Sequence, residues 1–94
     1  MSDAKSIQMR RVEILNQYGI HARPAAMVVR LANRFLAEVW IEKEGTRVSA
    51  KSIMGLLTLE ASQGTKLALL ADGPDAEQAL DEIAALIECR FNEE

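Results

Sequence analysis

The chain has 94 residues, of which 49% are hydrophobic and 4% aromatic, and its formal net charge at pH 7 is −3. This size and composition predict a single domain over residues 1–94, with no linker and no apolar run near the roughly 18 residues that a membrane span requires. The one cysteine, Cys89, excludes an internal disulfide and has no His or Cys neighbour at ligand spacing, which argues against a metal site. We therefore expect a cytoplasmic protein without membrane insertion.

The first half of the chain contains a predicted strand, a helix and a hairpin. Residues 12–14 alternate as in a half-buried strand, and residues 16–19 supply the turn that follows. Residues 24–35 have apolar side chains at helical spacing. Residues 38–50 form two antiparallel strands joined by a turn at Glu44 and Gly45, with Trp40 as a sheet residue. Four side chains lie on another face of the predicted helix: Arg23, Met27, Arg30 and Arg34.

The second half repeats the alternation of helix and strand. Ser52 is a predicted N-cap for a short helix through residue 59, and residues 65–71 form a strand. After a turn at residues 72–74, Asp75 and Gln78 resemble a capping box for a final helix that extends to residue 91. The order βαββαβα predicts an α+β open-faced sandwich, a mainly antiparallel four-stranded sheet with three helices on one face.

His21 is the only histidine, and it stands just before the helix that Pro24 helps to start. The unpaired N–H groups and the dipole of a helix N-terminus favour an anion there by about 0.3–1 kcal/mol. Together with Arg23 they disfavour an imidazolium, so we expect a neutral imidazole able to accept a phosphoryl group. The adduct, with a charge of roughly −1.5 to −2, would be stabilised by the same groups. The spacing alone leaves open a histidine that merely caps the helix.

Two motifs, GIHARPAAM around His21 and KSIMGLLTL after the hairpin, resemble those of HPr, the histidine-containing phosphocarrier proteins of the bacterial phosphoenolpyruvate-dependent sugar phosphotransferase system. The likeness extends over about residues 6–91. It implies that His21 receives a phosphoryl group on Nδ1 from enzyme I, charged by phosphoenolpyruvate, and passes it to a IIA component. It also implies that Arg23 stabilises the phosphate, and that the protein is a monomeric carrier with no cofactor and no enzyme activity of its own.

Ser52 matches the serine that an HPr kinase/phosphorylase modifies in many members of that family. A plain N-cap worth about 1 kcal/mol is the simpler interpretation of this serine. Phosphate at a helix N-terminus is also compatible with the dipole, so a regulatory binding protein controlled by phospho-Ser52 is the alternative function. An acid/base enzyme that uses His21 is a weaker hypothesis, because no second catalytic residue stands at an interpretable spacing.

A partner-binding surface is predicted beside the histidine. The inward side of the helix at residues 53–59 is expected to consist of Ile53, Leu56 and Leu57, which leaves Met54 exposed unless it fills a gap in the core. An adaptable thioether suits a surface that binds several partners. The predicted surface comprises Met27, Arg30, Lys51, Ile53, Met54 and Gly55, although a solvated basic face would explain its charged members equally well.

The charges are unevenly distributed along the chain. Residues 1–70 contain ten Lys and Arg against six Asp and Glu, a balance of +4, whereas residues 71–94 contain one against eight, a balance of −7. The basic region predicts an acidic protein partner and not nucleic acid, because no Lys/Arg cluster alternates with aromatic residues. The acidic end, including Glu93 and Glu94, is expected only to solvate the C-terminus, and Tyr18 is expected to stay clear of the phosphoryl chemistry.

Overall fold

The structure is a computed structural model that describes residues 7–93. Its elements are β1 (Gln8–Glu13), α1 (Ala22–Ala32), β2 (Glu38–Lys43), β3 (Thr46–Ser49), α2 (Ile53–Thr58), β4 (Lys66–Asp72), α3 (Ala76–Glu88) and the single turn η1 (Arg90–Asn92). The predicted order of strands and helices is confirmed.

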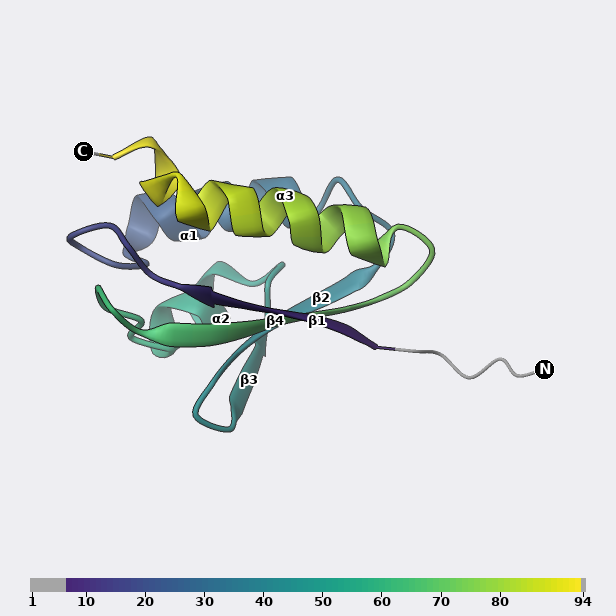
Figure 1. The fold of residues 1–94 in the computed structure, drawn as a ribbon, viewed down its shortest axis with the longest axis horizontal. Helices are drawn as coiled ribbons and strands as arrows, with labels where there is room; N and C mark the ends of the chain where they lie inside the picture. Colours follow the sequence, from purple (N-terminus) through teal and green to yellow (C-terminus); the bar gives the residue numbers. More distant parts are fainter. Residues whose placement is uncertain (1–6, 94) are drawn as a thin grey trace.

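The four strands form one sheet in the order β1-β4-β2-β3, and every neighbouring pair is antiparallel. α1 and α3 lie side by side over one face of this sheet, and the shorter α2 packs against α1 and β3 (Figure 1). The predicted α+β open-faced sandwich is therefore confirmed. The end of α3 and the loop between β1 and α1 lie at the same end of the molecule (Figure 1).

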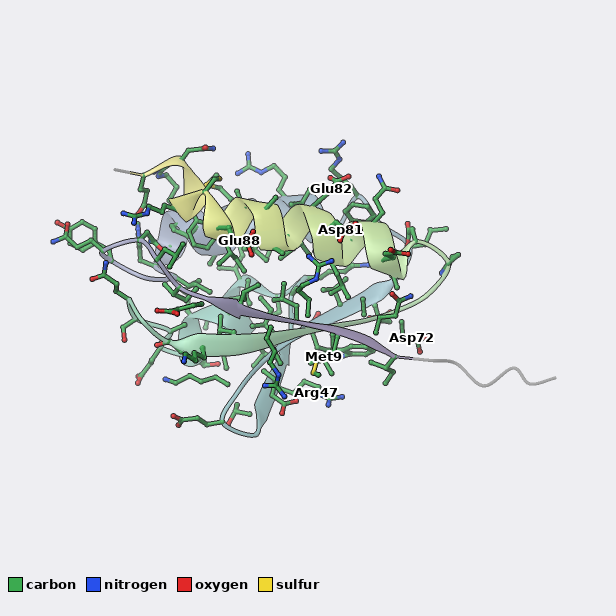
Figure 2. All side chains as sticks on the ribbon, in the orientation of Figure 1. Met9, Arg47, Asp72, Asp81, Glu82 and Glu88 are labelled. Carbon is green, nitrogen blue, oxygen red and sulfur yellow. The ribbon has the colours of Figure 1, made fainter. Side chains whose placement is uncertain are left out.

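The core lies between the sheet and the two long helices. Alternate residues of the strands face the helices, and fully buried side chains of α1 and α3, such as Val28 and Ile83, cover them. Met9 and Arg47 project from the opposite side of the sheet (Figure 2). The guanidinium of Arg47 lies 5.9 Å from the ring centroid of the half-buried Trp40, which is a sheet residue as predicted.

Both long helices are shorter than predicted. α1 ends at Ala32, and Phe35, although buried, lies in the turn that follows. α3 ends at Glu88, and Phe91 lies beyond it in η1 with a φ of 54°. A periodic apolar pattern in the sequence indicates which side chains are buried. A buried residue in the turn after a helix can therefore continue the pattern although the helix has already ended.

Two predicted local features are wrong. The capping box does not form, because Asp75 makes no side-chain cap bond and its carboxylate instead accepts the backbone N–H groups of Leu36 and Ala37, at 2.9 Å each. The Gln78 amide donates to Glu82. In α2 the only buried residue is Leu56, so the inward orientation predicted for Ile53 and Leu57 is also wrong.

Candidate phosphoryl-acceptor site

His21 occupies the N-cap position of α1 with an extended backbone, at φ −96° and ψ −164°. Its side chain makes no capping hydrogen bond and is 42% exposed. His21 therefore stands at the cap position, but its side chain does not cap the helix. The imidazole stands at the positive end of α1 and is accessible from solvent.

The first turn of α1 offers free backbone donors. The Ala25 N–H donates to the His21 carbonyl at 2.9 Å, which starts the helical pattern of bonds. Pro24 has no N–H, and the N–H groups of Ala22 and Arg23 have no acceptor within residues 7–93. Such unpaired groups at a helix N-terminus attract an anion.

The loop before the histidine is held tightly against the segment that precedes β4. Gly19 has a φ of 66°, and a Cβ on it would lie 2.2 Å from the Ala61 carbonyl oxygen. The next N–H, that of Ile20, donates to the same oxygen at 2.9 Å. Only glycine satisfies both the left-handed backbone and this close approach, so Gly19 fixes how the chain enters the site.

The carboxylate of Glu93 lies inside the site, which corrects the prediction that this residue only solvates the C-terminus. Its Oε2 atom is 2.8 Å from His21 Nε2 and 3.4 Å from Arg23 Nη2, and its Oε1 accepts the Asn16 amide at 3.0 Å. Only 13% of the Glu93 side chain is exposed. The hydrogen bond from Asn16 lowers the pKa of Glu93; burial opposes this shift, while the hydrogen bond and charge of His21 and the charge of Arg23 add to it.

Asn16 was expected only as a turn residue, yet its side chain holds two parts of the site by hydrogen bonds, the loop before His21 and Glu93. It is fully buried, and its Nδ2 donates both to the Gly19 carbonyl at 2.8 Å and to Glu93. Both neighbours are acceptors, which fixes the orientation of the amide. Its Oδ1 is buried without a partner among the described residues. Asn16 follows Ile14 by two positions, as an inward-facing strand residue would. This spacing is the one sequence signal that could have indicated a buried Asn16.

Tyr18 lies next to the imidazole of His21. Its ring stands edge-on to that of His21, with centroids 6.2 Å apart and an interplanar angle of 89°. This geometry is within the range of favourable aromatic contacts. Tyr18 therefore restricts one side of the imidazole, although 70% of the tyrosine itself is exposed.

Arg23 lies on the solvent side of the site, in the first turn of α1. Its side chain is 59% exposed, with Nη2 near Glu93 and Nη1 4.0 Å from the Met27 sulfur. The structure thus brings together His21 and Arg23, as the motif predicts, and adds two residues that the motif does not contain, Asn16 and Glu93.

Ser52 begins α2, and its Oγ accepts the Gly55 N–H at 3.0 Å, which confirms the predicted N-cap. The predicted exposure of Met54 is confirmed at 72%. The Lys51 ammonium donates a hydrogen bond to the Phe35 carbonyl at 3.1 Å, which ties Lys51 to the turn that follows α1. Gly55 has a packing role as well, because a Cβ there would lie 3.2 Å from the Val48 side chain.

A groove of about 330 Å³ runs along the face of α1 that carries the predicted docking residues. It is lined by Met27, Arg30 and Leu31 from α1, by Arg34 from the turn that follows α1, and by Leu86 from α3. Within residues 7–93 no group of three or more His, Cys, Asp or Glu side chains is arranged to hold a metal ion. Over the same residues, no helix is both long and apolar enough to cross a membrane.

A histidine and an arginine at the start of a helix on an open-faced sandwich define a class of small domains that carry a phosphoryl group. Residues 8–89 match the family model described as the PTS HPr component phosphorylation site. The chain belongs to the HPr family of phosphocarrier proteins of the phosphotransferase system.

Proteins from several bacteria are similar to this chain. Phosphocarrier protein HPr of Treponema pallidum (strain Nichols) is 42% identical over 86 residues, which cover 92% of this chain and 98% of that protein. The HPr-like protein Crh of Bacillus subtilis (strain 168) is 47% identical over 79 residues, 84% of this chain and 93% of that protein. The crystal structure of HPr-C-His from Thermoanaerobacter tengcongensis superimposes with a TM-score of 0.89 at 45% identity, covering 93% of this chain and 98% of that one.

Proposed function

We propose that this chain accepts a phosphoryl group on His21 from enzyme I, which derives it from phosphoenolpyruvate, and donates it to IIA components in sugar uptake or a related regulatory relay. It acts as a monomeric single domain in the cytoplasm, with no cofactor and no catalytic activity of its own. Arg23 and the free N–H groups of the first turn of α1 stabilise the phosphoryl group. Partners dock on the surface of Met27, Arg30, Lys51, Ile53, Met54 and Gly55.

The observation that carries the proposal is the position of the His21 imidazole. The ring is exposed, it stands at the N-terminus of α1 where two amides are unpaired within the described residues, and Arg23 is beside it. Donors already fixed in place can stabilise a dianion without the cost of reorganising solvent. The exposed, apolar Ile53 and Met54 and the basic residues of α1 supply a surface for protein partners.

The test is incubation of the full chain with phosphoenolpyruvate and enzyme I. We expect one phosphoryl group per chain, labile in acid and stable in base, as for a phosphoramidate on histidine. The His21→Ala variant should remain unlabelled, whereas Ser52→Ala should be labelled like the original chain. Labelling of His21→Ala under these conditions would contradict the assignment.

The position of Ser52 favours a second role that can coexist with the first. Its hydroxyl caps α2 next to the exposed Ile53 and Met54, so a phosphate on it would add negative charge to the partner surface. We propose that an HPr kinase/phosphorylase modifies Ser52 and so changes which partners bind. An acid-stable label that requires ATP and is lost in Ser52→Ala supports this role, and an ATP-dependent label that persists in that variant contradicts it.

A further inference from the structure

The hydrogen bond between Glu93 and His21 joins residues that are 72 positions apart in the chain. We propose that Glu93 is a positioning residue for phosphoryl transfer: its carboxylate holds His21 as the Nε2–H tautomer and leaves the Nδ1 lone pair free as the nucleophile. This inference rests on the proposed function and goes beyond it, because it assigns a role to a residue outside both sequence motifs.

The tautomer follows from the donors and acceptors that meet at the imidazole. An ionised carboxylate can only accept hydrogen bonds, and a neutral imidazole carries one proton on one of its two nitrogens. Because Glu93 Oε2 lies 2.8 Å from Nε2, the proton is on Nε2 when the ring is neutral. The lowered pKa of Glu93 keeps this carboxylate ionised at neutral pH. Nδ1 has no partner among the described residues, so its lone pair is available.

The transfer step balances with this arrangement. The Nδ1 lone pair of His21 forms the new N–P bond while the bond between phosphorus and the leaving atom of phosphorylated enzyme I breaks, and the leaving atom keeps that electron pair. The proton on Nε2 stays in place during the step, so the ring of His21 gains positive charge. A carboxylate hydrogen-bonded to the far nitrogen stabilises such a developing imidazolium.

The chain beyond α3 has a shape that delivers Glu93 to this position. Arg90, Phe91 and Asn92 all have left-handed backbones, with φ values of 62°, 54° and 62°. Consecutive non-glycine residues adopt this conformation only where their surroundings impose it. Phe91 is fully buried and anchors the turn, and the fully buried Asn16 binds the second oxygen of Glu93. The contact between Glu93 and His21 therefore depends on two buried residues, Phe91, which holds the backbone, and Asn16, which holds the carboxylate.

The negative charge of Glu93 does not exclude a phosphoryl group from the other nitrogen. Arg23 Nη2 lies 3.4 Å from the same Oε2 atom and offsets its charge. The Arg23 side chain is 59% exposed, so it has room to turn toward a phosphoryl group on Nδ1. In that arrangement Glu93 faces the protonated nitrogen of the ring, and Arg23 faces the phosphorylated one.

The first arm of the test needs no partner protein. The ¹⁵N chemical shifts of the two ring nitrogens, measured by NMR under conditions in which the ring is neutral, report which nitrogen is protonated. In the original chain we expect a predominant Nε2–H tautomer. In Glu93→Ala we expect the shifts to move toward the tautomer mixture of a solvated imidazole. Glu88→Ala, which loses an equal charge at an exposed position on the preceding helix, serves as the control and should match the original chain.

The second arm measures single-turnover phosphorylation by phosphorylated enzyme I. We expect Glu93→Ala to be slower by about 10- to 100-fold, which is below the roughly 100- to 10,000-fold effect of a general acid or base, because Glu93 transfers no proton and the ring is partly in water. Glu93→Gln should also be slow, since a neutral acceptor cannot stabilise the cationic ring. Glu88→Ala should react at the original rate.

Two results would overturn the inference. Unchanged ring shifts and an unchanged rate in Glu93→Ala would show that the contact has no effect on His21. A faster reaction in that variant would show that Glu93 merely covers the ring. Failure of the proposed function looks different, because the original chain would then not be phosphorylated at all while the NMR arm still reported the contact.

Discussion

Two carboxylates, Asp75 and Glu93, join segments that are distant in sequence. Asp75 accepts hydrogen bonds from the N–H groups of Leu36 and Ala37. It thereby joins the turn between α1 and β2 to the start of α3. The bond from Leu36 lowers the pKa of Asp75; burial opposes this, and the bond from Ala37 and the charge of Lys51 act in the same direction as Leu36. Each carboxylate is therefore bound more strongly in its ionised form, and acid should release both contacts.

The stability of the protein should consequently depend on Asp75 in acid. Because its folded pKa lies below the unfolded value of 3.8, its contribution is complete above that pH and is lost as the pH falls through the folded pKa. We expect Asp75→Asn to be less stable than the original chain at pH 7, with the difference shrinking as the pH falls below 3.8. Urea unfolding at pH 7 and at a series of acidic pH values measures this.

Asp81→Asn is the matched control for that experiment. Asp81 is exposed on α3 (Figure 2) and pairs only with Arg10 among the described residues. A surface pair contributes little, so this variant should stay close to the original chain at all of these pH values. A pH-independent loss of stability in Asp75→Asn would show that the charge of Asp75 is irrelevant to the turn.

At the scale of elements, the site depends on how the segments around α1 and α2 are held. The loop before α1 owes its path to Gly19, and α2 has one buried residue and few helical turns, so its start depends on the Ser52 cap. A helix as short as Ile53–Thr58 has little stability of its own and relies on capping and tertiary packing. Substitutions at Gly19 and Ser52 should therefore change the stability of the loop before α1 and of α2 without removing a group that takes part in phosphoryl transfer.

Gly19→Ala tests the loop. The substitution adds a Cβ 2.2 Å from the Ala61 carbonyl oxygen and requires a left-handed alanine. We expect a loss of about 3 kcal/mol in the free energy of unfolding, from the sum of backbone strain and overpacking. Gly64→Ala has a similar φ, 89°, but no atom within 4 Å of the new Cβ, so it should cost only about 1 kcal/mol. Equal losses in the two variants would mean that the contact with Ala61 is unimportant.

Ser52→Ala tests the cap of α2. Loss of the bond from the Gly55 N–H should lower the free energy of unfolding by about 1 kcal/mol, as urea unfolding measures it. Ser52→Asp retains an acceptor and adds negative charge at the helix N-terminus, so it should recover that stability. If Ser52→Ala were as stable as the original chain, the cap would have no energetic role.

Across the whole molecule, local features were predictable from the sequence and long-range contacts were not. The fold was predicted from the periodicity of apolar residues. The proximity of His21 and Arg23 was predicted because they stand two positions apart at the start of a helix. Glu93 reaches His21 only through a left-handed turn of non-glycine residues, for which the sequence has no local signature. The exposure of Ile53 was missed because exposed and buried apolar residues can have the same spacing along a helix.

The uneven distribution of charge leads to a prediction about association with enzyme I. Arg30 lines the groove on α1, whereas Arg47 projects from the sheet on the opposite side of the molecule from the helices (Figure 2). If partners approach the α1 face with acidic groups, Arg30→Gln should slow second-order phosphoryl transfer from enzyme I by about 2- to 5-fold at low salt, because a rim charge acts mainly on the association rate.

Arg47→Gln removes the same charge and should leave that rate unchanged. The deficit of Arg30→Gln should also shrink toward 1 M salt, where the screening length is only about 3 Å. Rates measured across a salt series with both variants therefore separate local steering from an effect of net charge. Equal slowing by the two substitutions, or a deficit that salt does not reduce, would place the docking surface away from α1.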